Sequence, residues 1–504
     1  MRRIQILTAV TCLALSADPS DAQNLAELLP RLLSESVTMP STVGTVAGNP
    51  HEAHFLPSAA QLVAPYAMNG AVVGQLATFP IGSSSGGFTY NSDSATGFPV
   101  RSSGNFGPSF TERALVIGKG KFSAGLNFQH VSFQRFENLD LNGGPTFYLQ
   151  HNDCCPNQGA DGTPILGTTG PSVDVNPFFE GDLVRTSLNL EAWTETTVLF
   201  ANYGLSDRFD MALSVPFVRV KLDASMSSEL LRLSTAASPT IHSFGGSSPD
   251  SRVSKESGTA SGIGDILLRG KYRVAKAPGG GLALAVDVRL PTGDKENLLG
   301  TGATQVKGAL VFSRDYGSFS PRLNAGYTFS SGSLSSDVAT YHLGDEVPVP
   351  IAGASNAYQT VFRQAPQAAL DEQRLEIPDE INYAGGFSIQ AGSRTTFNAD
   401  LIGRTLRGVY RFDVTSRSFN YRLATGGAVL NKTYTDVLDV RNSAGPNTLP
   451  PPPSDSLTLL LGAVGAKFNI PNTTLLLNFN VLFPLTTAGL QPKTTFVAGI
   501  DYAF

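Results

Sequence analysis

Charged side chains are scarce in this 504-residue sequence. Asp, Glu, Lys and Arg make up 15% of the residues, against about 25% in a typical soluble domain. After the first segment, no apolar run approaches the roughly 18 residues that a membrane-spanning helix needs. The formal net charge of −5 argues against nucleic acid as a partner, because proteins that bind it carry a basic surface. A chain with few charges and no spanning helix favours a β-barrel with a lipid-facing exterior.

Cysteine is also scarce, with only three in the sequence. Cys12 falls in the expected signal peptide, which leaves Cys154 and Cys155 next to each other. A disulfide in a loop is the preferred interpretation of this pair. A metal site with His151 is less favoured, because adjacent cysteines cannot easily hold one ion in tetrahedral geometry. We therefore expect no metal and no cofactor.

No catalytic motif stands out. Barrel enzymes need a Ser–His or Asp–His pair held in a defined geometry, and the spacing of the six histidines singles out no such partner. The glycine pairs lack the sequence context of a phosphate-binding loop. The sequence therefore predicts no enzyme and no catalytic residues.

The N-terminus has the features of a secretory signal peptide over residues 1–22. Arg2 and Arg3 form a positive start, residues 4–17 are apolar, and a small-residue cleavage site ends at Ala22. Next comes a leucine-rich segment, residues 24–33, that predicts a short helix. Asn24 is placed to cap this helix, and Pro30 is expected to bend or break it.

Residues 23–110 predict a plug or a periplasmic segment. The region is too long for an ordinary connector, and it contains more phenylalanine than a disordered leader would. Its most distinctive piece runs from Phe79 to Phe88 around Gly82, Gly86 and Gly87. Glycine lets the backbone pass close to a crowded wall. We expect this piece to lie in the barrel, with Arg269, Lys271, Arg273 and Arg322 donating to its carbonyl groups.

The last residues give the clearest strand. Phe496, Ile500, Tyr502 and Phe504 share one parity, and small or polar residues occupy the other. A strand sends alternate side chains to opposite faces, and outer-membrane barrels place aromatic residues on the lipid side. Similar alternation recurs from about residue 120. Residues 111–504 therefore predict an all-β fold, a transmembrane antiparallel barrel of about 12 strands, with 14 as the alternative. Fourteen would require residues 111–117 to form a strand and residues 183–204 to split in two.

The connectors between the expected strands alternate in length. This alternation predicts which end of the barrel faces the cell exterior. Short connectors such as residues 205–208 and 391–394 alternate with long ones such as residues 223–262 and 332–379. Outer-membrane barrels have short periplasmic turns and long extracellular loops. We therefore expect the cell outer membrane as the location and its lipid as a partner.

Several segments resemble the outer-membrane proteins of the putative meta-pathway of phenol degradation, a family grouped with transporters of hydrophobic compounds. The similar segments are residues 118–133, Tyr203–Asp210, Val215–Val218, Gly262–Asp265 and Arg289–Asp294. The resemblance implies a barrel that passes hydrophobic compounds. It also implies that the assembly machinery for barrels reads the C-terminal strand ending in Phe504.

Ten charged residues fall on the parity that faces the lumen. They are Asp265, Arg269, Lys271, Arg273, Asp287, Arg289, Lys307, Arg322, Asp400 and Arg404. They could set the selectivity of a pore or form a structural network of ion pairs. The predicted function is passive uptake of a small hydrophobic or aromatic solute. The alternative is a structural or adhesive barrel that binds through its long loops.

Overall fold

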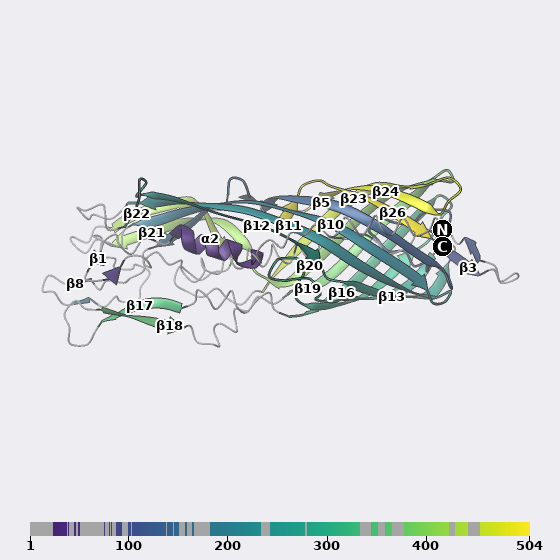
Figure 1. The fold of residues 1–504 in the computed structure, drawn as a ribbon, viewed down its shortest axis with the longest axis horizontal. Helices are drawn as coiled ribbons and strands as arrows, with labels where there is room; N and C mark the ends of the chain where they lie inside the picture. Colours follow the sequence, from purple (N-terminus) through teal and green to yellow (C-terminus); the bar gives the residue numbers. More distant parts are fainter. Residues whose placement is uncertain are drawn as a thin grey trace, which may run out of the picture.

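The computed structural model describes residues 24–37, 39, 45–46, 49–50, 75, 80, 82, 87–92, 99–101, 103–137, 139–144, 146–150, 157–158, 164–165, 182–232, 242–277, 280–332, 344–350, 358–364, 377–422, 429–441 and 454–503. The expected signal peptide, Phe79, Gly86, Cys154, Cys155 and Phe504 lie outside these residues. The dominant feature is one closed antiparallel barrel (Figure 1).

Twelve strands form the barrel wall. They are β5 (Phe122–Phe136), β10 (Leu183–Gly204), β11 (Phe209–Leu231), β13 (Leu267–Ala277), β14 (Gly280–Arg289), β15 (Thr304–Ser313), β16 (Phe319–Ser331), β19 (Asp379–Ala391), β20 (Thr395–Val409), β23 (Asp455–Asn469), β24 (Leu475–Pro484) and β26 (Thr495–Ala503). β26 pairs with β5 and closes the ring. The prediction of twelve strands is confirmed. The alternative of fourteen is wrong, because residues 183–204 form one strand and residues 111–117 form none.

The outward faces of these strands are apolar. Leu284, Leu310 and Phe496 are 48%, 52% and 70% exposed, whereas Asp287 and Asp400 on the opposite parity are 3% and 6% exposed. Large apolar side chains turned outward over a whole barrel are what a lipid environment requires. This arrangement defines the class of protein, an outer-membrane β-barrel. Among the described residues, no helix is both long and apolar enough to cross a membrane.

Two wall strands continue far beyond the barrel at the end that carries the long connectors. β10 and β11 run over 22 and 23 residues, and β12 (Ser251–Ile263) pairs with the outer half of β11. β11 pairs with β13 up to Ser214 and with β12 from Phe217, so Pro216 lies where the partner changes. Proline lacks a backbone N–H donor, and such a donor is little needed at a position where the neighbouring strand changes.

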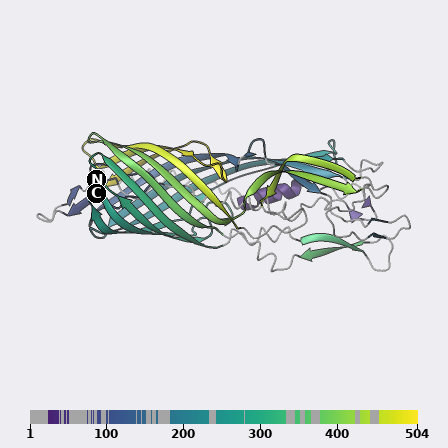
Figure 2. The ribbon, with the colours of Figure 1, turned by 180° about the vertical axis from the view of Figure 1, so that it is seen from behind.

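The outer extension is completed by shorter strands and a helix (Figure 2). The remaining strands of the sheet are β6 (Leu139–Asp140), β7 (Thr146–Gln150), β21 (Phe412–Arg422), β22 (Val429–Val440) and β25 (Leu490–Pro492). Within the described residues, four small hairpins stand apart from this sheet. They are β1 (Thr45–Val46) with β2 (Asn49–Pro50), β3 (Tyr90–Ser92) with β4 (Pro99–Arg101), β8 (Asn157–Gln158) with β9 (Pro164–Ile165), and β17 (Gly344–Pro350) with β18 (Tyr358–Gln364).

The predicted N-terminal helix forms as η1 (Leu25–Glu27) followed by α2 (Leu28–Val37). Its leucines Leu25, Leu28, Leu29 and Leu32 are at most 1% exposed and belong to one apolar cluster with side chains of β10 and β11. Two expectations are wrong. The Asn24 side chain makes no capping hydrogen bond, and Pro30 does not break the helix. Pro30 lies in the first turn of α2, where its missing N–H has no helical partner to lose.

Candidate functional site

Residues 103–117, hereafter the inserted segment, lie inside the barrel rather than in its wall. The first wall strand begins at Phe122, and Phe106, Ala114 and Ile117 are at most 1% exposed. A non-helical, non-strand segment must find partners for its backbone groups among the wall side chains. The lumen-facing polar residues supply them.

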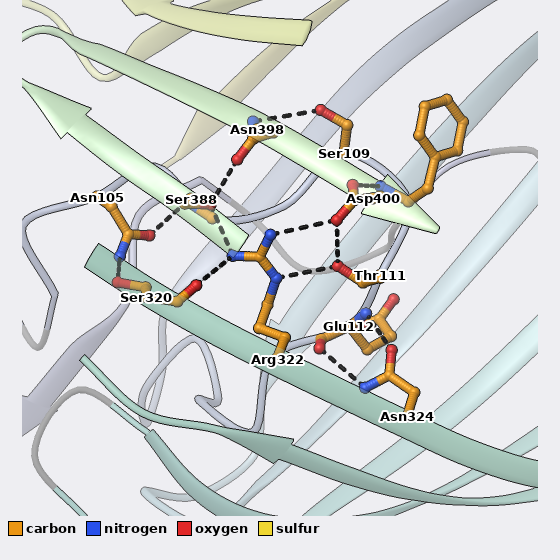
Figure 3. Close-up of polar contacts among 12 residues, drawn as sticks. Asn105, Ser109, Thr111, Glu112, Ser320, Arg322, Asn324, Ser388, Asn398 and Asp400 are labelled. Atoms are coloured by element: carbon orange, nitrogen blue, oxygen red, sulfur yellow. Dashed lines mark hydrogen bonds and ion pairs between the residues drawn. The ribbon is translucent and has the colours of Figure 1, made fainter. Parts of the chain in front are cut away.

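The tip of the inserted segment, Phe110, Thr111 and Glu112, is held by β16 and β20 (Figure 3). The Phe110 N–H donates to Asp400 Oδ2 at 3.2 Å, and Thr111 Oγ1 donates to Asp400 Oδ1 at 2.8 Å. Arg322 Nε donates to Thr111 Oγ1 at 2.9 Å. Asn324 bonds both the N–H and the carbonyl of Glu112, at 2.7 and 3.1 Å. Two wall strands therefore hold three consecutive tip residues.

The Glu112 carboxylate forms the main charge contact between the tip and the wall. It pairs with Arg269 Nη1 and lies 3.7 Å from Lys271 Nζ. Asp287 fixes the Arg269 guanidinium from the other side, with Nε–Oδ1 and Nη2–Oδ2 distances of 2.5 and 2.6 Å. Lys307 Nζ also contacts Asp287 at 2.6 Å. The bidentate pair orients Arg269 so that Nη1 points toward the tip.

A second attachment lies at the end of the barrel that carries the short turns. The Gly87 N–H donates to Asp501 Oδ2 at 2.8 Å, and its carbonyl accepts from Arg113 at 3.1 Å. A Cβ at Gly87 would lie 1.8 Å from Leu476 Cδ1, so any larger residue here would have to displace the Leu476 side chain. Phe88 packs edge-on against Phe106, with ring centroids 5.4 Å apart.

Of residues 75–87, the structure describes Gln75, Pro80, Gly82 and Gly87, and these lie at different levels of the barrel. Gln75 accepts from the Leu490 N–H at 2.9 Å near the long-connector end. Gly82, with a φ of +90°, lies against Asn127 and the Ser109 carbonyl. Gly87 reaches the short-turn end. The described positions of this stretch therefore line the inside of the wall.

A cavity of about 260 Å³ lies between these segments and the wall. Phe110 and Glu112 belong to its lining, as do Gln75 and Gly82. One part of its wall is charged, with Arg269, Asp287, Arg289, Lys307, Glu380 and Arg404. Another part is apolar, with Phe133, Ile402, Leu459, Leu461 and Leu490. One molecule bound in the cavity would therefore contact both an apolar surface and a charged surface.

The ten predicted lumen residues fall into groups. Arg269, Asp287, Arg289, Lys307 and Arg404 line the cavity. Lys271, Arg322 and Asp400 contact the inserted segment. Arg273 instead donates to the Asp207 carbonyl in a short turn at 2.8 Å. Asp265 binds a loop, accepting from the N–H groups of Gly293 and Thr301 at 3.1 and 2.8 Å.

We expected Arg269, Lys271, Arg273 and Arg322 to bind the carbonyls of residues 79–88. The described residues show other contacts for these cations, while most of residues 79–88 lies outside the described part of the chain. At the described positions, Arg269, Lys271 and Arg322 contact the tip, and Gly87 is held by Arg113 and Asp501. Sequence reasoning missed Glu112, Arg113, Glu380 and Asp501. Residues 111–117 contained a sequence signal for these contacts. Two adjacent charged residues, Glu112 and Arg113, interrupt a stretch that otherwise resembles a buried strand.

Part of the chain matches a known protein family. A model of the family described as "Putative MetA-pathway of phenol degradation" matches residues 180–353. That range includes four of the five segments in which the resemblance was found. A search of curated proteins gives no match.

Solved structures with similar folds have low sequence identity. An outer membrane channel from Pseudomonas putida F1 is 12% identical, with 78% of this chain and 98% of that chain covered and a TM-score of 0.36. A Pseudomonas aeruginosa FadL homologue is 9% identical, with 77% and 90% covered and a TM-score of 0.30. The toluene transporter of Ralstonia pickettii is 11% identical, with 77% and 89% covered and a TM-score of 0.23. Because these sequence identities and TM-scores are low, the fold is assigned from the strand pairing of this chain itself.

Proposed function

We propose that this protein is an outer-membrane channel for passive uptake of small hydrophobic or aromatic compounds, and that it is not an enzyme. The observation that carries the proposal is the cavity inside the barrel, bounded by the tip and by an apolar arc of wall residues. Ligand sites are typically concave, mostly apolar and equipped with a few polar groups. The family match over residues 180–353 is consistent with this function.

The size of the cavity suits a single aromatic ring with a substituent. Its volume is about 260 Å³, whereas an apolar cavity of about 150 Å³ accepts benzene. A solute of this size fits beside Phe133, Ile402 and Leu461 without displacing the wall. To pass on toward the short-turn end, it must move the tip or pass beside it.

We further propose an orientation and an assembly route for this barrel. The long-connector end faces the exterior and the short-turn end faces the periplasm, as in outer-membrane barrels generally. Removal of residues 1–22 as a signal peptide and assembly through the C-terminal strand with Phe504 remain predictions. β26 supports the second, because Phe496 and Tyr502 present aromatic rings on its outer face, 70% and 39% exposed.

Uptake by cells tests the proposal. Porin-deficient Gram-negative cells that express the protein should take up radiolabelled benzamide faster than cells without it. Ala309 lines the cavity, so Ala309→Trp should block most of this gain by filling the space. Leu310→Trp is the matched control, because Leu310 points outward and is 52% exposed. Equal uptake with and without the protein would overturn the proposal.

A further inference from the structure

A groove crosses the outer face of the barrel over β5, β26, β24, β23 and β20. One row of cross-strand neighbours alternates phenylalanine with alanine, in the order Phe128, Ala498, Phe479, Ala466 and Phe397. The three rings are 43%, 53% and 50% exposed, and each alanine leaves a slot between two of them. The groove has a volume of about 800 Å³, so it has room for long apolar chains.

The groove ends in polar side chains on the side of the long connectors. His130, Ser132 and Lys493 belong to its lining there. The Lys493 N–H donates to the Ser132 carbonyl at 2.7 Å, and His130 Nε2 lies 3.2 Å from Ser132 Oγ. Lys493 is exposed, and in the described part of the chain no carboxylate pairs with its ammonium group. This end of the groove can therefore receive an anionic group from outside the protein.

The polar end continues across the wall onto β10 and β11. Glu195 lies 3.4 Å from His130 Nδ1 and 3.8 Å from Arg219 Nη1. The Arg219 side chain is 56% exposed, and its Cζ lies 5.5 Å from the centre of the Trp193 ring. Tryptophan is enriched where hydrocarbon meets the polar headgroups of a membrane. In the orientation proposed above, these residues therefore mark the level of the outer-leaflet headgroups.

The headgroup should decide which lipid occupies the groove. Acyl chains in the groove gain packing contacts but little hydrophobic free energy, because the surrounding lipid is as apolar as the wall. Lysine and arginine near a membrane surface attract anionic lipids and bind phosphate oxygens in charge-assisted hydrogen bonds. Arg219 lies two strands away from β5, about 10 Å at the usual strand spacing. A large headgroup with two separate phosphates could therefore reach both Lys493 and Arg219.

We propose that this groove is a binding site for one acylated, phosphorylated glycolipid of the outer leaflet. Its acyl chains lie in the slots over Ala466 and Ala498. One phosphate lies at Lys493, and the headgroup extends past Trp193 toward Arg219. The site is separate from the lumen cavity, so the inference goes beyond the channel function and depends only on the proposed orientation.

Lipid A and its dephosphorylated form are the test pair, because they share their acyl chains and differ in the phosphates. Native mass spectrometry of the full-length protein in a mild detergent should show lipid A binding at least about fivefold more tightly, since one cation near a lipid surface contributes about 1 kcal/mol. Inorganic phosphate at the same concentration as the lipid should not displace it. Equal binding of the two lipids, or displacement by inorganic phosphate, would overturn the inference.

Two variants, each with a matched control, locate the site. Lys493→Gln should weaken lipid A binding about fivefold, whereas Lys276→Gln should not, because Lys276 is an exposed cation at the short-turn end of β13. Ala466→Phe fills a slot and should weaken the binding of both lipids. Ala201→Phe is its control, because Ala201 is opposite the outward Leu213 and is not part of the groove. Lipid A affinities that are the same in all four variants would overturn the inference.

The outcomes separate this site from the channel function. Ala466→Phe should leave benzamide uptake unchanged, because Ala466 is not in the lining of the lumen cavity. Absence of protein-dependent benzamide uptake would overturn the channel function and leave the lipid site standing. If topology measurements inverted the orientation, the polar end of the groove would lie in the inner leaflet, and the inference would be wrong.

Discussion

Arg322 and Asp400 form a buried ion pair across the lumen face of the barrel. Arg322 Nη2 lies 3.2 Å from Asp400 Oδ1, and the two side chains are 2% and 1% exposed. They come from β16 and β20, which are separated by β19. Both also bond Thr111, and Arg322 Nη1 donates to Ser388 at 2.6 Å. The pair therefore joins three wall strands to the inserted segment.

Replacing Asp400 should loosen the inserted segment without opening the barrel. Asp400→Asn leaves the buried Arg322 without its counter-charge, and breaking such a pair costs about 3–5 kcal/mol. Hydrogen exchange should accelerate in residues 103–117 and stay slow in the wall strands. Asp223→Asn is the control, since its exposed pair with Lys221 contributes at most about 1 kcal/mol. Unchanged exchange in residues 103–117 would contradict the role assigned to Asp400.

A charge placed on the outer face should impair assembly, and the same charge on the lumen face should not. Leu310→Arg puts a cation into lipid, at a cost of about 2–4 kcal/mol near the bilayer midplane. Ala309→Arg places it on the lumen side, in the lining of the cavity that also contains Asp287. The amount of heat-modifiable barrel in outer-membrane fractions measures the difference. Equal assembly of the two variants would argue that this outer face does not meet lipid.

Cysteine labelling of intact cells should establish the orientation. In a background with Cys154 and Cys155 changed to serine, Ser247→Cys should react with a membrane-impermeant maleimide. Arg208→Cys should react only after the outer membrane is permeabilised. Both positions are exposed, but Ser247 lies in the outer extension and Arg208 in a short turn between β10 and β11. The opposite pattern would invert the orientation.

The leucine face of α2 should anchor the N-terminal segment to the outer extension. Leu32 is fully buried, and replacing such a leucine with alanine costs about 2–5 kcal/mol. Leu32→Ala should therefore make α2 sensitive to protease added outside intact cells. Arg31→Ala is the neighbouring control, because its pair with Glu256 is 46% and 22% exposed and contributes little. Similar protease resistance of both variants would contradict the anchoring.

Much of the wall could be predicted from the sequence because its signal is local. Leu282, Leu284 and Val286 alternate with Ala283, Ala285 and Asp287, and each residue faces lipid or lumen according to its parity. The same regularity predicts that Arg269 and Asp400 point inward. Glu112 was missed because it lies in no strand, so no periodic neighbours mark it. Glu380 lies in β19 on the same parity as Asn382 and Ser388, so the alternation could have placed it in the lumen. Residues 111–117 show some alternation but pair with no strand.

The sequence by itself determined a membrane barrel with an apolar exterior, because alternation along a strand depends only on neighbouring residues. The choice of twelve strands over fourteen came from the strand pairing in the structure. Only the tertiary structure decided what occupies the lumen. The contact between Glu112 and Arg269 joins residues 157 positions apart, and Thr111 lies 289 positions from Asp400. Such contacts depend on how the inserted segment folds back into the closed barrel. No pattern of neighbouring residues in the sequence indicates the course of that segment through the lumen.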